Sequence, residues 1–326
     1  MTEEKEELSE QFENIFRKHV QPLIMRHLEN DWHARSIVYT VEPGRNRFRS
    51  GLAYLLSGQE KSGIVIGAAS EVAWAAILIL DDIGDNTAIR RGKDSAWRKF
   101  GLLETPHAAT LGFLLARQIL KKGKIKSSLI RNLEKSIEHT LRAQIEQGSW
   151  SEHTSQDAVL NNYSKKTDLG RWPIEASAMV NNKISYQDKE NIKRFSEYVA
   201  IAAQIKNDLD DIIGIKDEEY EVPMKDLQEK MLNYPTALFF NVASVEDKER
   251  FLNEYWGYNI TPKIIKGIIE MLGRYNVFGQ CIAEIDRRIS LALVSIKNLS
   301  HPYRGLLTRW VESYRINQEE LQKWVR

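Results

Sequence analysis

Hydrophobic residues recur at helical spacing along most of the chain. Between Glu7 and His27 they follow one another at intervals of three and four residues, which predicts an amphipathic helix. The run from Ile64 to Leu80 is apolar on almost every side, so the helix predicted over 64–85 should be buried in the middle of a bundle. No strand-like alternation of useful length interrupts this pattern. The chain is therefore predicted to be mostly helical.

Further helices are predicted from the same periodicity, and no linker divides them. They include a helical region around Trp97 and Phe100, a helix that continues through 176–180, and helices over 51–56, 107–120, 129–150, 201–211, 236–242, 263–275, 280–296 and 306–325. Without a Pro/Gly/Ser-rich linker or a shift in composition, a single domain over residues 1–326 is predicted. The longest apolar run contains Ser70 and Glu71, and we expect no membrane span.

Composition and charge narrow the possible partners and compartment. The 326 residues are 42% hydrophobic and carry a net charge of +1, which permits a large core and gives no global preference for nucleic acid. The lysine-rich stretch 121–126 is interpreted as a solvated basic loop, so no nucleic-acid partner is expected. Cys281 is the only cysteine, which fits a reducing compartment. The N-terminus is acidic where a targeting peptide is basic, and a cytoplasmic location is expected.

Three carboxylates end the most apolar helix. Asp81, Asp82 and Asp85 lie within five residues. At about 100° per residue, Asp81 and Asp85 point about 40° apart. Crowded carboxylates repel one another unless a cation lies between them, and oxygen-only ligands suit Mg²⁺ shared with substrate phosphates. Arg90 and Arg91 follow, and guanidinium groups bind phosphates in a bidentate manner. The alternative is a solvated acidic helix end, which so long an apolar run rarely precedes.

A second polar cluster ends the helix predicted over 201–211. Asn207 and Asp211 share a face, with Asp208 beside them. Two such clusters could face each other across a cavity and share several Mg²⁺ ions with one diphosphate. Basic residues near two helix starts are weaker signals, because solvated basic turns are common: Arg45, Arg47, Arg49, Lys165 and Lys166.

These two clusters resemble the motifs of the trans-isoprenyl diphosphate synthase (polyprenyl synthase) family. The similar residues are Asp81-Asp82-x-x-Asp85-x-x-x-x-Arg90-Arg91-Gly92 and Gln204-Ile205-x-Asn207-Asp208-x-x-Asp211, within a stretch of resemblance from Gly44 to Pro235. The resemblance implies an all-α isoprenoid-synthase helical bundle around a deep apolar cavity. It also implies three Mg²⁺ ions, an allylic prenyl diphosphate substrate and a homodimer.

The motifs, the resemblance and the departures described next give expected residue roles in three groups. Metal ligation is expected of Asp81, Asp82, Asp85, Asn207, Asp208 and Asp211. Catalysis is expected of Asp81, Asp82, Asp85, Arg90, Lys166 and Asp208. Substrate binding is expected of Arg47, Arg49, Trp74, Arg90, Arg91, Lys166, Gln204 and Lys230.

The sequence departs from the family at four positions. Asn46 replaces a lysine, and Trp74 replaces the His or Gln that stands seven residues before the first aspartate; both contact the chain-extending diphosphate in the family. Lys230-Met231 occupies the place of Gly-Lys, so that lysine is displaced by one residue or lost. Asn207 replaces an aspartate and, with Asp208, is similar to the start of the second metal motif of class I terpene synthases. The rest of that motif is not matched, because Asp211 and Ile215 stand at its next two positions.

The favoured hypothesis is an enzyme that ionises an allylic diphosphate without condensing it with isopentenyl diphosphate. The cation would undergo terpene cyclisation or pass to another acceptor. The intact ionising motif beside a reduced extender site supports this, and the Trp74 ring could stabilise a carbocation, with core packing as its alternative role. The modest size of residues near the cavity floor favours a tail longer than ten carbons: Ala73, Ala76 and Ile77.

Two alternatives stay open. The first is a chain-elongating isoprenyl diphosphate synthase, in which Arg49 and Arg91, with Arg45 and Arg47, rebuild the second diphosphate pocket. The second is a non-catalytic regulatory subunit of a synthase, against which the complete first acidic motif speaks.

Overall fold

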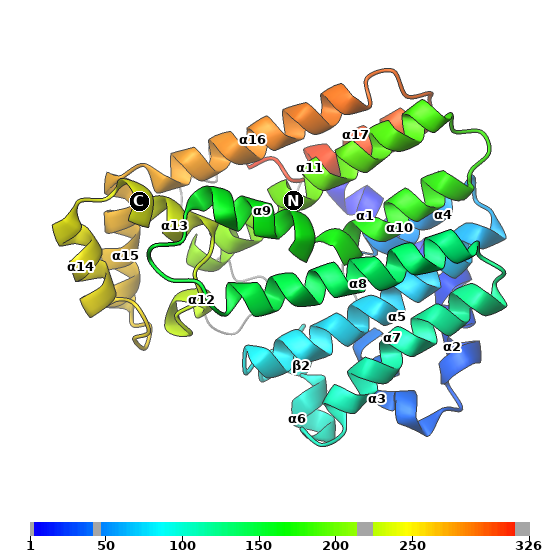
Figure 1. The fold of residues 1–326 in the computed structure, drawn as a ribbon, viewed down its shortest axis with the longest axis horizontal. Helices are drawn as coiled ribbons and strands as arrows, with labels where there is room; N and C mark the ends of the chain where they lie inside the picture. The colour runs from blue at the N-terminus through cyan, green and yellow to red at the C-terminus, as the bar shows by residue number, and fades with distance from the viewer. Residues whose placement is uncertain (1–2, 42–46, 214–223, 317–326) are drawn as a thin grey trace.

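The computed structural model describes residues 3–41, 47–213 and 224–316, and these form a bundle of α-helices (Figure 1). The first half contains α1 (Glu3–Ile15), a π-helical turn η1 (Phe16–Val20), α2 (Gln21–Leu28), a 3₁₀ turn η2 (Trp32–Ala34), α3 (Arg35–Val41), α4 (Phe48–Leu56), α5 (Lys61–Gly84), α6 (Ala96–Phe100), α7 (Thr105–Lys122) and α8 (Ser127–Gln147). The predicted all-α fold is confirmed.

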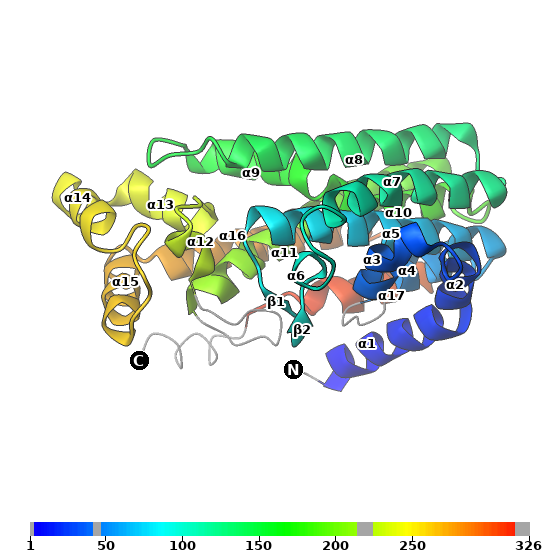
Figure 2. The same ribbon diagram turned by 90° about the horizontal axis from the view of Figure 1, so that it is seen from below.

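In the second half, all elements of the described residues are helices. They are α9 (Gln156–Lys166), α10 (Asp168–Val180), α11 (Tyr186–Ile213), α12 (Lys225–Gln228), α13 (Tyr234–Val242), α14 (Val245–Glu254), α15 (Pro262–Arg274), α16 (Val277–Ser295) and α17 (Tyr303–Glu312). Figure 2 shows α8 and α9 along one face of the bundle and α1 along the opposite face.

Two local features differ from the predicted pattern. The helix expected over 7–27 is broken into α1, η1 and α2, and Pro22 stands at the start of α2, where its missing N–H does no harm. After α5 the chain forms a short hairpin of β1 (Ile89–Arg90) and β2 (Lys93–Asp94). Its two turn residues, Arg91 and Gly92, have φ values of 55° and 73°, as a tight type I′ turn requires.

The helix α5 lies at the centre, packed against α4, α7 and α10. Its small residues allow close approach, because a Cβ at Gly67 would lie 3.2 Å from the Ser50 Cα of α4. Among the described helices, α5 alone is long and apolar enough to cross a membrane, yet 83% of its most apolar window is buried inside the fold. That burial is typical of a core helix. The absence of a membrane span stays a prediction.

Two clusters of buried side chains fill the bundle. One surrounds α5 and α7, and the other surrounds α11, α13 and α16. The helices α4 and α10 contribute residues to both, for example Leu52 to one and Ala53 to the other. The two halves therefore share supporting helices, although the single domain over 1–326 stays a prediction.

The contact between α5 and α7 is expected to tolerate no added side chain at Gly112. A Cβ there would lie 2.7 Å from Ile37 Cδ1 and 3.0 Å from Ala76 Cβ. Gly112→Leu should therefore lower the free energy of unfolding by about 1–3 kcal/mol or more, measured by urea denaturation. Gly273→Ala in α15 is the control, since nothing lies within 4 Å of that position and alanine should stabilise the helix slightly. Equal stabilities for both variants would contradict this packing.

Candidate active site

The ends of α5 and α11 bring the two acidic stretches together at one end of the bundle. The Lys166 ammonium lies close enough to lower the pKa of both Asp81 on α5 and Asp208 on α11. The Lys225 ammonium, just beyond α11 in the fold, donates a hydrogen bond to Thr87 Oγ1 in the loop after α5. Two stretches that are more than 120 residues apart in the chain thus form opposite walls of one site.

On the first wall, the carboxylates of Asp81 and Asp82 have different surroundings. Gln144 Nε2 of α8 donates a hydrogen bond to Asp81 Oδ1. Burial raises the pKa of Asp81 to about 7; Lys166 opposes this shift and the charge of Asp85 adds to it. Asp85 follows the last turn of α5 and is half-buried. Asp81 and Asp85 are thus the two half-buried carboxylates of this wall.

Asp82 holds Arg90 in place. It is 1% exposed, and Arg90 Nε of the hairpin donates to its Oδ1 at 2.6 Å. Burial raises the pKa of Asp82 and the nearby guanidinium lowers it. The carboxylate is held against a fixed guanidinium, and metal ligation by Asp82 stays a prediction. Asp82 therefore orients Arg90.

On the second wall, protein donors surround Asp208. The Tyr163 hydroxyl donates to its Oδ2, Gln204 Nε2 to its Oδ1 at 2.9 Å, and the Tyr234 N–H to its Oδ2 at 3.2 Å. Asp208 is 4% exposed, and burial raises its pKa to about 7. Gln204 is predicted to contact the substrate, and in this structure its side-chain amide donates a hydrogen bond to Asp208. Both residues are thereby fixed, and metal ligation by Asp208 stays a prediction.

Asp211 and Asn207 lie one helical turn apart on the same wall. Asp211 accepts hydrogen bonds from the N–H groups of Lys225, at 3.0 Å, and Asp226, at 3.4 Å, so it holds the start of α12. Burial, and then the charge of Asp226, raises the pKa of Asp211. Asn207 is exposed to solvent. Asp211 thus faces the site, while metal ligation by Asn207 stays a prediction.

Sequence reasoning missed a carboxylate on α12. The negative charge of Asp226 raises the pKa of both Asp208 and Asp211. The pKa of Asp226 itself is raised first by burial and further by the charge of Asp85. Asn233 Nδ2 donates to Asp226 Oδ2 at 3.0 Å. Asp226 thus lies between the two walls. No periodic pattern marks it, because α12 spans only four residues and Asp226 stands 15 positions after Asp211.

Two lysines bring positive charge to the acidic site. Lys166, at the end of α9, donates to Gln147 Oε1 at 2.7 Å. Lys225 lies 3.8 Å from Glu229 and donates to Thr87. Lys230 is different: it is exposed, it has a φ of 58°, and its side chain lies over Gly257. A glycine is favoured at such a φ, which explains the family pattern at this position. Substrate binding by Lys230 stays a prediction.

The oxygen donors of the two walls can bind a divalent ion only together with a further ligand, such as water or a substrate phosphate. Within the described ranges, no three carboxylate, imidazole or thiolate groups converge to hold a metal ion by themselves. Protein hydrogen bonds already occupy Asp82, Asp208 and Asp211. Magnesium keeps several waters and is commonly shared between one or two carboxylates and substrate phosphates. Carboxylates with raised pKa values on two neighbouring walls meet that requirement.

Arginines gather beside this site, around the buried Glu71 of α5. Arg47 Nη1 donates to Glu71 Oε2 at 3.2 Å, and Arg49 Nη2 lies 3.8 Å from the same oxygen. Burial lowers the pKa of Arg49 to about 10; Glu71 opposes this, and the positive charges of Arg91 and Arg47 add to it. Arg49 and Arg91 are thus neighbours, from α4 and from the hairpin.

Arg47 itself is engaged in packing. Its Nη2 donates to the Val41 carbonyl at 2.5 Å, its Nε lies 3.4 Å from Glu13, and its guanidinium lies over the Phe16 ring. These contacts make Arg47 a support for the turn that carries Arg49, and its contact with a substrate stays a prediction. Arg45, Asn46 and Ile215, named in the sequence comparison, lie outside the described residues.

The Trp74 ring has a neighbour that the sequence did not suggest. The Arg49 guanidinium lies over it, 4.3 Å from the ring centroid. One ring face is therefore covered by a cation, which argues against the predicted stabilisation of a carbocation by that face. The cavity-floor residues Ala73, Ala76 and Ile77 are fully buried, and Ala76 packs towards Gly112 of α7. The expected tail length stays a prediction.

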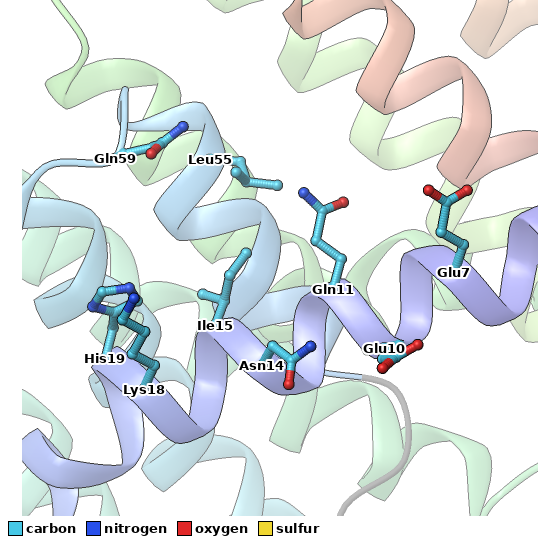
Figure 3. A pocket seen from close by; sticks show the side chains of 9 residues that line it. All are labelled: Glu7, Glu10, Gln11, Asn14, Ile15, Lys18, His19, Leu55 and Gln59. Carbon is cyan, nitrogen blue, oxygen red and sulfur yellow. The ribbon is translucent and has the colours of Figure 1, made fainter.

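A groove of about 470 Å³ lies elsewhere on the molecule (Figure 3). It is lined by side chains of α1, η1 and the end of α4, namely Glu7, Glu10, Gln11, Asn14, Ile15, Lys18, His19, Leu55 and Gln59. None of these residues belongs to the acidic walls, so the groove is separate from the candidate active site.

The metal-free protein is expected to lose stability as the pH rises from about 5 to about 8. The folded state raises the pKa of Asp81, Asp208 and Asp211, whereas carboxyls in the unfolded chain titrate near pH 4. In that window the folded state binds more protons, so the free energy of unfolding falls with rising pH. Thermal unfolding in EDTA should show this slope, and added Mg²⁺ should reduce it. A stability that rises across the window would contradict the assignment.

Comparison with known proteins gives a consistent result. The polyprenyl synthetase family model matches residues 30–272. Geranylgeranyl pyrophosphate synthase 6, mitochondrial, of Arabidopsis thaliana is 27% identical over 233 residues, covering 63% of this chain and 67% of its own. Farnesyl diphosphate synthase of Geobacillus stearothermophilus is 25% identical over 265 residues, covering 74% of this chain and 88% of its own.

Solved structures share the fold at lower identity. A decaprenyl diphosphate synthase from Rhodobacter capsulatus superposes with a TM-score of 0.83 at 16% identity, over 95% of this chain and 98% of that one. A polyprenyl synthase from Caulobacter crescentus, complexed with calcium and isoprenyl diphosphate, gives a TM-score of 0.81 at 17% identity, over 93% and 97%. Because the family model covers well over half of the sequence, the chain belongs to the polyprenyl synthetase family, whose members are prenyltransferase enzymes.

Proposed function

We propose that this protein is a chain-elongating isoprenyl diphosphate synthase, which joins an allylic prenyl diphosphate to isopentenyl diphosphate. The observation that carries the proposal is the pair of unlike sites: an acidic site between α5 and α11, and an arginine site beside it where Arg49 and Arg91 meet. A reaction between two diphosphates needs two such sites. Ionisation of a single diphosphate, as in terpene cyclisation, needs only the acidic one.

The sequence-based preference for terpene cyclisation or another acceptor is not supported. The curated relatives are named as synthases of geranylgeranyl and farnesyl diphosphates. The Arg49 guanidinium also lies over the Trp74 ring, so a cation already occupies one ring face, which weighs against a role of this ring in stabilising a carbocation. The positions of the acidic residues likewise give no support to a non-catalytic subunit. The homodimer and the cytoplasmic location stay predictions.

The acidic site would receive the allylic diphosphate. Divalent ions, which we propose to be three Mg²⁺ held chiefly by Asp81, Asp85 and Asp211, would neutralise the negative charge that develops on the leaving diphosphate. Arg90, fixed by Asp82, and Lys166, fixed by Gln147, supply further positive charge from the protein. Because their partners hold them, these groups need little rearrangement when charge develops.

The second diphosphate would lie at Arg49 and Arg91. Bound there, isopentenyl diphosphate presents its double bond to the allylic carbon. The allylic C–O bond breaks, a C–C bond forms, and one proton leaves to restore a double bond. The apolar surroundings of α5 keep water from the cation. Proximity of the two bound substrates supplies much of the acceleration.

Elongation is tested by incubating the purified protein with Mg²⁺ and C10, C15 and C20 allylic diphosphates, with and without isopentenyl diphosphate. We expect longer prenyl diphosphates only when isopentenyl diphosphate is present. The matched control is the double variant Asp81→Asn/Asp85→Asn, which should lose at least about a hundredfold in rate because charge stabilisation is lost. A hydrocarbon or alcohol that forms without isopentenyl diphosphate would contradict the proposal.

Asp226 is expected to lower the stability of the metal-free protein and to raise its affinity for Mg²⁺. In Asp226→Asn the hydrogen bond with Asn233 can persist, while repulsion of Asp208, Asp211 and Asp85 disappears. The melting temperature of the metal-free variant should rise by about 2–4 °C, and its affinity for Mg²⁺ in calorimetry should fall by about tenfold.

The control for this variant is Asp157→Asn, which removes an exposed acid from the first turn of α9. It should change neither the melting temperature nor the affinity for Mg²⁺. A lower melting temperature for Asp226→Asn together with unchanged Mg²⁺ binding would show that Asp226 serves packing alone.

A further inference from the structure

We propose that Trp74 is a positioning residue for the second diphosphate: its ring holds the face of the Arg49 guanidinium and leaves the N–H edge of that group for isopentenyl diphosphate. The inference rests on the proposed function and assigns a role to a residue that departs from the family pattern. Trp74 acts through Arg49 and needs no contact of its own with the substrate.

Three helices fix the two partners. Arg49 comes from the first turn of α4, and Trp74 comes from the middle of α5. The guanidinium carbon of Arg49 lies 4.3 Å from the centroid of the Trp74 ring. The Phe48 ring lies 4.9 Å from the same carbon. Gly170 of α10 borders the indole, because a Cβ there would lie 3.6 Å from Trp74 Cζ3. The indole is thus held between α4 and α10.

The hydrogen-bond donors of Arg49 are little used by the protein. Its contact with Glu71 is an ion pair at 3.8 Å, longer than a hydrogen bond, and its buried Nε has no hydrogen-bond partner among the described residues. Glu71 instead accepts hydrogen bonds from Arg47 at 3.2 Å and Ser50 at 2.8 Å. A guanidinium that is held by its face keeps its planar edge for bidentate binding of a phosphate.

The stack also stabilises the charge of Arg49 against repulsion by neighbouring arginines. The positive charges of Arg91 and Arg47 oppose the charge of Arg49, which is 6% exposed. The negative face of an indole attracts a guanidinium without occupying its donors. A second carboxylate would neutralise Arg49 and compete with the diphosphate. An indole at position 74 therefore replaces a direct donor, as implied by the family pattern, with a support for the neighbouring donor.

Steady-state kinetics of Trp74→Leu and Trp74→Phe test the inference. Trp74→Leu should raise the KM for isopentenyl diphosphate about tenfold, while kcat and the KM for the allylic substrate change less than about twofold. Trp74→Phe keeps a ring face and should stay within about threefold of the wild type. Calorimetry with isopentenyl diphosphate alone should show the same order of affinities without turnover.

Trp32→Leu is the matched control. It removes a stack with a similar centroid distance, since Arg35 lies 4.2 Å from the Trp32 centroid, but Trp32 is 63% exposed and belongs to η2, which contributes none of the residues assigned to either site. It should leave both KM values unchanged. Thermal unfolding of each variant separates a folding defect from a binding defect, and Trp74→Phe keeps the test open if Trp74→Leu does not fold.

Two outcomes of the kinetic measurements would overturn the inference: equal rises in both KM values for Trp74→Leu, or Trp74→Phe as impaired as Trp74→Leu. Either would make Trp74 a packing residue. The proposed function fails separately, if the wild type forms no longer prenyl diphosphate with isopentenyl diphosphate. A wild type that elongates, with Trp74→Leu binding isopentenyl diphosphate unchanged, would refute this inference alone.

Discussion

Repulsion among partly buried carboxylates is the constraint on which this molecule depends. Asp81 on α5 and Asp85 just after it lie on one wall, Asp208, Asp211 and Asp226 gather beside it, and burial raises the pKa of most of these groups. Cations and hydrogen-bond donors of the surrounding elements reduce that repulsion. Lys166 and Lys225 lie between the walls, Tyr163 and Gln204 hold Asp208, and the start of α12 sits on Asp211. A site that is strained when metal-free gains most from a bound cation.

The helix α5 links the two anion sites and sets their separation. Trp74 and Asp81 are seven residues apart, so they lie on nearly the same face and about 10 Å apart along the axis. Asp81 serves the acidic site and Trp74 supports Arg49 of the arginine site. Close packing against α4 and α7 at glycine positions keeps the helix in place. Under the proposed function, the distance between the two bound diphosphates is therefore set largely by one rigid element.

Much of the fold was predictable, because a strong helical period of apolar residues is visible in the local sequence. The first acidic motif ends α5 as expected, since a buried helix must bring its terminal carboxylates to an opening. What could not be predicted depends on contacts between distant segments. Asp226 lies on a helix too short to show a period, and the roles of Asp82 and Arg47 follow from partners chosen in three dimensions. The hairpin depends on a two-residue turn that spacing alone did not reveal.

The departures from the family motifs acquire a different meaning once their neighbours are known. Asn207 removes one negative charge from α11, but Asp226 of α12 and Glu229 just after α12 add carboxylates near Asp85. Trp74 removes a donor, but its ring holds the guanidinium of Arg49. In each case the local charge or donor is provided from the adjacent element, so a motif position records only part of what its site contains. Loss of a motif residue is then weak evidence for loss of the reaction, because the electrostatic requirement belongs to the site as a whole.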